Sequence, residues 1–256
     1  MRRTCLVLIS ALLQMLACSL RMPCYSMDEI AAINKRILAK PKNSDVYFER
    51  AAEKLKYLDY EGCVENVTRS IELKPTADKY FIRAVARRET GKLLDAEMDF
   101  EKSAQLSPRS ENAYAELACL AAKLRHYDKA NRAFEQLFKL SPVRFVERSR
   151  RAEMYLQMKK PQAALNDVET CLKIDSDAGG RCHTILGLAC VQLRQYERAV
   201  DAFNFAIKKN EFNIDARKGR LEAYEKLGNK KMAQQERRAL EEEFSEAFNL
   251  APFRSK

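Results

Sequence analysis

The chain contains few of the residues that make tight turns or bind metals. Among 256 residues there are 7 glycines, 7 prolines and 2 histidines. Average proteins contain about 7% glycine and 5% proline, so a turn-rich sandwich or barrel is not expected. With only His126 and His183, a multi-histidine metal site is excluded as well. Because GxGxxG, GxxxxGKS/T and GxSxG motifs are also missing, no cofactor, metal ion or catalytic residue is expected.

The composition is that of a folded, basic, helical protein. Hydrophobic residues make up 46% of the chain, which excludes disorder for most of it. The length fits one large domain or two small ones, since domains run about 100 to 200 residues. A formal net charge of +10 favours anionic partners such as acidic peptides, lipid head groups or nucleic acid. The excess is spread along the chain, which weakens that inference.

The first twenty residues have the layout of an export signal. Arg2 and Arg3 precede an apolar run over residues 5–17. The run from Cys5 to Leu20 is 16 residues long and Gln14 interrupts it, whereas a membrane-spanning helix needs about 20 apolar residues. A cleaved signal is therefore expected.

The end of this segment resembles the lipobox of bacterial lipoproteins. It reads Met15-Leu16-Ala17-Cys18, with a small residue before the cysteine. The resemblance implies that residues 1–17 are removed, that Cys18 receives lipid, and that the protein is a membrane-anchored lipoprotein of the cell envelope. Plain secretion with cleavage near residues 24–26, an uncleaved signal anchor and a buried N-terminal helix remain as alternatives.

An internal repeat organises most of the remaining chain. Prolines stand at 41, 75, 108 and 142, so they are 34, 33 and 34 residues apart. Each of the last three closes an apolar-periodic stretch, because proline stops a helix after its last turn. A fixed period of this length predicts a solenoid of stacked helix pairs.

The repeated residues resemble the tetratricopeptide repeat family, whose unit is an antiparallel helix pair, A and B. A small residue recurs at position 8 of five units and at position 20 of all six. The resemblance covers residues 44–242 and implies an all-α, right-handed α-solenoid of about six helix pairs. The six units, repeats 1 to 6, begin at Ser44, Ala77, Glu111, Phe145, Gly180 and Ile214.

Short segments flank the repeats. Residues 18–43 are expected to hold an N-terminal segment and a capping helix from Asp28 to Lys40, which covers the open end of repeat 1. Residues 243–256 are expected to continue the last helix into a tail. Within the repeats, Gly91 and Gly228 stand where helix A can end in the left-handed conformation.

The resemblance also implies a binding surface, because the A helices of this family line a concave face. Positions 2, 5, 9 and 12 of helix A share one side by helical spacing. A large apolar patch there marks an interaction site, although Phe81, Ile82 and Val85 also suit tight packing between the helices. The expected partner-binding residues are Phe81, Ile82, Val85, Arg88, Asn112, Arg181, Ile185 and Leu188.

The densest basic cluster is made of Arg144, Arg148, Arg150 and Arg151. On a helix residues 148 and 151 share a face while 150 points elsewhere, so the cluster is not one stripe. A solvated charged face and a site for an acidic partner are both open. Nucleic acid is not expected, because no aromatic residues are interleaved with the arginines.

The cysteines have two interpretations. No CxxC pair is present, which disfavours zinc and thioredoxin-like chemistry. Buried cysteines behave as small apolar residues, and this accounts for the group. Alternatively Cys171 and Cys182 form a disulfide that joins one helix B to the next helix A across a short loop.

Together these features predict a non-catalytic adaptor that binds a partner protein in the concave groove. The signal and the repeats point to an assembly factor in the cell envelope, which contacts the membrane through the lipid on Cys18. A soluble secreted or luminal adaptor and an electrostatic binder of an anionic polymer are the alternatives. The identity of the partner stays open.

The mass of the mature N-terminus tests the lipobox. We expect a diacyl or triacyl mass on Cys18 in the membrane fraction, and we expect Cys18→Ala to abolish it. An unlipidated terminus near Met27 would instead indicate a soluble exported protein. Retention of Met1 would indicate a signal anchor.

Overall fold

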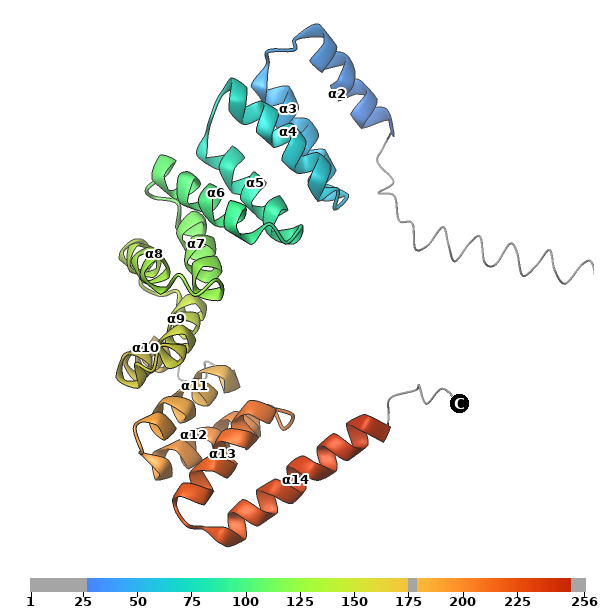
Figure 1. The fold of residues 1–256 in the computed structure, drawn as a ribbon. Helices are drawn as coiled ribbons and strands as arrows, with labels where there is room; N and C mark the ends of the chain where they lie inside the picture. The colour runs from blue at the N-terminus through green and yellow to red at the C-terminus, as the bar shows by residue number, and fades with distance from the viewer. Residues whose placement is uncertain (1–26, 175–178, 250–256) are drawn as a thin grey trace, which may run out of the picture. The chain divides into compact units, whose positions relative to one another are not determined.

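The computed structural model describes residues 27–174 and 179–249, which form helices and contain no strand (Figure 1). This confirms the predicted all-α repeat fold. None of the helices in these ranges is long and apolar enough to cross a bilayer. The 13 helices are α2 (Met27–Ala39), α3 (Ser44–Lys56), α4 (Tyr60–Leu73), α5 (Ala77–Glu89), α6 (Leu93–Leu106), α7 (Glu111–Lys123), α8 (Tyr127–Leu140), α9 (Phe145–Gln157), α10 (Pro161–Ile174), α11 (Gly179–Gln192), α12 (Tyr196–Lys209), α13 (Ile214–Lys226) and α14 (Lys230–Asn249).

The chain divides into two compact parts within α7, between Leu117 and Ala118. The N-terminal part contains α2 to α6 and the beginning of α7. The C-terminal part contains the rest of α7 and α8 to α14. Within each part, consecutive helices pack against each other as antiparallel pairs.

The A helices are α3, α5, α7, α9, α11 and α13, and they follow the period of the sequence. Five of them begin at the first residue of a repeat, and α11 begins one residue earlier, at Gly179. The start of α3 is fixed by Asn43, whose side chain accepts a hydrogen bond from the backbone N–H of Asp45. Helix α2 precedes repeat 1 and packs on α3.

Small residues lie where the two helices of a pair cross. Ala51 and Cys63 are fully buried in the N-terminal part, as are Ala152 and Ala164 in the C-terminal part. In a close-packed interior, a larger side chain at such a point forces the helices apart. The small residues therefore set the spacing between A and B helices.

The tightest of these contacts surrounds Phe203 of α12. Its ring is fully buried between Gly187 of α11 and Gly219 of α13. A Cβ atom added at Gly187 or at Gly219 would lie 2.4 Å or 2.3 Å from the Phe203 ring. Only glycine at both positions leaves room for this ring.

All six A helices end in the same left-handed turn. The residues with positive φ at these ends are Leu58, Gly91, Arg125, Lys159, Arg194 and Gly228. At Arg194, for example, the backbone N–H bonds to the carbonyl of Val191, and the next N–H bonds to the carbonyl of Cys190. This Schellman pattern satisfies the last carbonyls of the helix, so four of the repeats hold an ordinary residue where glycine is favoured.

Replacing Arg194 by glycine is expected to stabilise the protein. Arg194 is exposed and has a φ of 61°, and a left-handed L-residue costs about 1 kcal/mol. Glycine removes this cost but loses more chain entropy on folding. We expect the free energy of unfolding in urea to rise by about 0.5 kcal/mol.

The control is Glu222→Gly, at an exposed site inside α13. It should lower the free energy of unfolding by about 1 kcal/mol. An equal decrease in the free energy of unfolding for Arg194→Gly and Glu222→Gly would contradict the strain assigned to Arg194.

Candidate functional site

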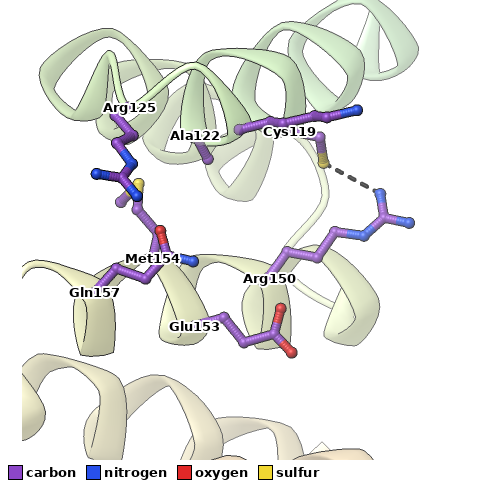
Figure 2. A pocket seen from close by; sticks show the side chains of 8 residues that line it. Cys119, Ala122, Arg125, Arg150, Glu153, Met154 and Gln157 are labelled. Atoms are coloured by element: carbon purple, nitrogen blue, oxygen red, sulfur yellow. Dashed lines mark hydrogen bonds between the residues drawn. The ribbon is translucent and has the colours of Figure 1, made fainter.

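The C-terminal part carries a pocket of about 580 Å³ between the A helices α7 and α9 (Figure 2). Ala122 and Met154 form its apolar floor, and Met154 is only 2% exposed. Arg125, in the turn after α7, and Arg150 of α9 stand at opposite sides of the pocket. The lining residues are Cys119, Ala122, Lys123, Arg125, Arg150, Glu153, Met154 and Gln157.

A second pocket, of about 430 Å³, follows between α9, α11 and the start of α13. Glu153 lines both pockets, so together they form one surface across successive A helices, which we call the groove. The residues lining the second pocket are Glu153, Gly180, Arg181, Thr184, Ile185, Leu188, Lys209, Asn210, Asn213 and Asp215.

An ion pair stands where the two pockets meet. The guanidinium of Arg181 donates to both carboxylate oxygens of Glu153, over 2.9 Å from Nε and 2.6 Å from Nη2. The side chains are 52% and 40% exposed. The pair is therefore a bidentate contact on the open surface of the groove.

Positive charge dominates the first pocket. Lys123, Arg125 and Arg150 line it, against the single carboxylate of Glu153. Arg150 donates a hydrogen bond of 3.1 Å to the Sγ atom of Cys119, which ties α9 to α7. With Glu153 held by Arg181, this pocket presents a positive rim over an apolar floor.

Two of the residues expected to bind a partner line the groove as open surface. Arg181 and Leu188 both border the second pocket. Ile185 borders it too, but it is 2% exposed and belongs to the hydrophobic core of the C-terminal part. At position 6 of repeat 5 it packs inside the helix pair, so it belongs to the buried floor of the second pocket, as Met154 does in the first.

The other expected partner-binding residues lie in the N-terminal part, and two of them pack into its core. Phe81 meets Phe100 edge-to-face with the ring centroids 5.4 Å apart. Ile82 packs against the core cluster of this part. Val85 is half-buried, Arg88 forms an ion pair with Glu116, and Asn112 is exposed.

The predicted basic cluster is not one surface. Arg148 and Arg151 both pair with Asp167 of α10, at 3.7 Å and 2.6 Å, and their guanidinium groups lie over the ring of Phe138. Arg144 pairs with Glu147. Of the four, Arg150 lines the groove, whereas the other three are held in ion pairs, so the four side chains do not form one surface.

Asp167 belongs to a pattern that the sequence analysis missed. In repeats 2, 4 and 6 an arginine at position 7 of helix A bonds to a carboxylate sixteen residues later on helix B. Repeat 5 has Leu186 and Ala202 at the same two positions. The pairs are Arg83 with Asp99, Arg151 with Asp167 and Arg220 with Glu236.

These pairs are buried, and each carboxylate has two arginine partners. Asp99 and Asp167 side chains are 4% and 6% exposed. Arg87 is the second partner of Asp99. Burial alone would lower the pKa of Arg151, but its hydrogen bonds to Asp167 and the opposite charge raise it. Arg151 therefore stays charged, and the arginine–carboxylate pairs join helix A to helix B.

Cys171 and Cys182 are buried, adjacent and hydrogen-bonded to each other. The Sγ atom of Cys171 donates a 3.4 Å hydrogen bond to the carbonyl of Phe145. Its hydrogen bond with Cys182 and its burial raise the pKa of Cys171, and burial raises the pKa of Cys63 to about 11. These thiols remain protonated at neutral pH, which fits the small apolar role, and the disulfide stays a prediction.

Side chains of the metal-binding kinds do not converge in the ranges 27–174 and 179–249. No group of three His, Cys, Asp or Glu residues there is placed to hold a metal ion. The signal and lipobox, with Cys18, lie outside the described residues.

The sequence of repeat 3 matches a known repeat family. The tetratricopeptide repeat family matches residues 111–144, which is the length of one helix pair and begins where α7 begins. Residues 111–144 thus match one tetratricopeptide repeat. No curated protein sequence matches it.

Several solved structures resemble this chain, and at these identities they show its fold. A tetratricopeptide repeat protein from Parabacteroides merdae is 16% identical, with a TM-score of 0.66 over 75% of this chain and 77% of the other. MamA from Desulfovibrio magneticus RS-1 is 20% identical, with a TM-score of 0.61 over 65% and 93%. YrrB, described as a TPR protein with an unusual peptide-binding site, is 16% identical, with a TM-score of 0.66 over 72% and 95%.

Replacing Asp167 by alanine is expected to destabilise the C-terminal part strongly. It leaves the buried charges of Arg148 and Arg151 without their carboxylate, and breaking a buried pair in this way costs about 3 to 5 kcal/mol. The double variant Arg151→Leu/Asp167→Ala installs the residues that repeat 5 has at these positions. We expect the double variant to recover at least half of the loss in urea unfolding.

The control is Arg198→Ala, which removes an exposed ion pair with Glu169 and should change stability by less than about 1 kcal/mol. A double variant no more stable than Asp167→Ala would show that repeats with charged and apolar pairs are not interchangeable.

Proposed function

We propose that the protein is a non-catalytic scaffold that binds an extended segment of a partner protein in the groove of its C-terminal part. The observation that carries this proposal is the continuity of the groove, since Glu153 lines both of its pockets. The walls come from helix α7, helix α9, helix α11 and the start of α13. Recognition would thus be spread over successive repeats.

The size of the groove fits a short peptide in an extended conformation. Helices in direct contact lie about 8 to 10 Å apart, so the groove spans about 20 to 30 Å. An extended chain rises about 3.3 Å per residue, which corresponds to roughly six to nine residues. The apolar floor at Met154 and Leu188 would hold side chains, and the polar rim would fix the register.

Two further observations support a scaffold. YrrB, which shares the fold, is described as having a peptide-binding site. The charged residues at the meeting point of the pockets are engaged with each other in the Arg181–Glu153 pair, which is an arrangement for binding rather than for acid–base chemistry.

We also propose that the scaffold is exported and held at a membrane of the cell envelope through lipid on Cys18, where it assists assembly of a larger complex. The support is the signal-like segment over residues 1–17 and the lipobox-like residues after it. A soluble secreted or luminal adaptor is the alternative without lipid. Removal of Arg2 and Arg3 lowers the formal net charge from +10 to +8, which keeps an anionic polymer as a second class of ligand.

Filling the first pocket tests the proposed function. Ala122→Trp places an indole on the pocket floor, where Ala122 faces Met154 (Figure 2). Peptides of nine random residues selected for binding to the wild-type protein are expected to bind the variant at least tenfold more weakly, by fluorescence anisotropy. Circular dichroism should show an unchanged helix content.

The matched control is Gln162→Trp, on an exposed site of α10 outside the groove. Its affinity for the same peptides should equal that of the wild type. Equal binding to all three proteins would contradict a groove site. Heparin that displaces the peptides, or binds Ala122→Trp unchanged, would favour the anionic polymer.

A further inference from the structure

The Arg181–Glu153 pair differs from the other arginine–carboxylate contacts that join neighbouring helices. The pairs of repeats 2, 4 and 6 have carboxylates that are 4% to 6% exposed, and each holds helix A to helix B of the same repeat. Glu153 and Arg181 are 40% and 52% exposed, and they join the A helices of two successive repeats. An ion pair that is open to water contributes little to stability, so another carboxylate can replace Glu153 at low cost.

The groove around the pair has more positive than negative charge. Lys123, Arg125 and Arg150 line the first pocket beside Glu153. Lys209 lines the second pocket together with Asp215 and Arg181. Five cationic side chains therefore face two carboxylates, and one of these carboxylates is bound to Arg181. Such a groove attracts an anionic ligand.

We propose that Glu153 occupies the position of a ligand carboxylate, and that an acidic side chain of the partner segment displaces it from Arg181. This inference rests on the proposed function, because it names the chemistry of the segment that the groove binds. The guanidinium of Arg181 offers two parallel N–H donors, and a ligand carboxylate accepts both as Glu153 does. Glu153 thus acts as an internal competitor.

The displaced carboxylate has a new partner on its own helix. Glu153 lies three residues after Arg150 on α9, and side chains at this spacing are neighbours on a helix surface. When the ligand carboxylate binds Arg181, the side chain of Glu153 can pair with Arg150 instead. Glu153 and Arg181 then each keep an oppositely charged partner. Lys123 and Arg125 of the first pocket then face the ligand.

The floor of the groove adds an apolar requirement. Met154 in the first pocket and Leu188 in the second lie beneath the charged rim. Side chains of an extended chain alternate between two faces. A segment in which acidic and apolar residues alternate therefore presents apolar groups to the floor and carboxylates to Arg181 and Arg125.

The decisive experiment removes the competitor. The probe is a fluorescein-labelled nonapeptide of alternating glutamate and leucine, and its analogues carry glutamine or lysine in place of glutamate. Fluorescence anisotropy at 50 mM NaCl is expected to show at least tenfold tighter binding of the glutamate peptide than of the glutamine peptide. The lysine peptide should bind most weakly. Glu153→Gln should raise the affinity for the glutamate peptide about three- to tenfold, and Arg181→Gln should lower it by about as much.

Glu169→Gln is a closely matched control. Glu169 pairs with Arg198 over 2.6 Å, the two side chains are 40% and 45% exposed, and neither lines the groove. Both glutamate variants change the net charge by the same amount, so a gain from general attraction would appear in both. We expect a gain in Glu153→Gln alone.

Two outcomes would overturn the inference. One is an affinity of Glu153→Gln for the glutamate peptide that is no higher than that of the wild type or of Glu169→Gln. The other is equal binding of the glutamate and glutamine peptides. If selected peptides still bind the wild type and lose affinity for Ala122→Trp, only the acidic preference fails. If no peptide responds to Ala122→Trp, the proposed function itself fails.

Discussion

The close approach of helices A and B at small residues is the constraint on which the rest of the structure depends. Phe203 shows how strict it is, because its ring fits only between two glycines of the neighbouring A helices. Ala152 and Ala164 act in the same way one repeat earlier. Because helices A and B pack this closely, side chains of the two helices contact each other. Neighbouring A helices are then close enough to line one groove.

Arginine has two separate functions in this framework. At position 7 of helix A it is buried and joins a helix pair, as Arg151 does with Asp167. On the groove side it is exposed, as Arg125 is. Arg148 and Arg151 stand close to Arg150 in the sequence, yet they face α10 while Arg150 faces the groove. The formal charge therefore overstates the positive surface that a partner meets.

The sequence was sufficient to predict the repeat, but it predicted the site only in part. Prolines and small residues recur because helix ends and crossings have strict steric limits, so the starts of α3, α5, α7, α9 and α13 follow from them. Helix α11 begins one residue before its repeat, at Gly179, which has a positive φ. Helical spacing predicted that Arg181 and Leu188 line the groove, but it did not predict that Ile185 is buried in the core. The Arg–carboxylate pairs recur at a spacing of sixteen, and this signal was present in the sequence.

Both members of each Arg–carboxylate pair lie within one repeat, sixteen residues apart. Repeats 2, 4 and 6 thus each contain both members of the pair that joins their helices A and B. A gene duplication or deletion that moves one of these repeats as a whole keeps its pair intact, whereas a break between helices A and B separates the partners. Arrays of this kind can lengthen, shorten or exchange repeats during evolution while the groove on their A helices changes independently.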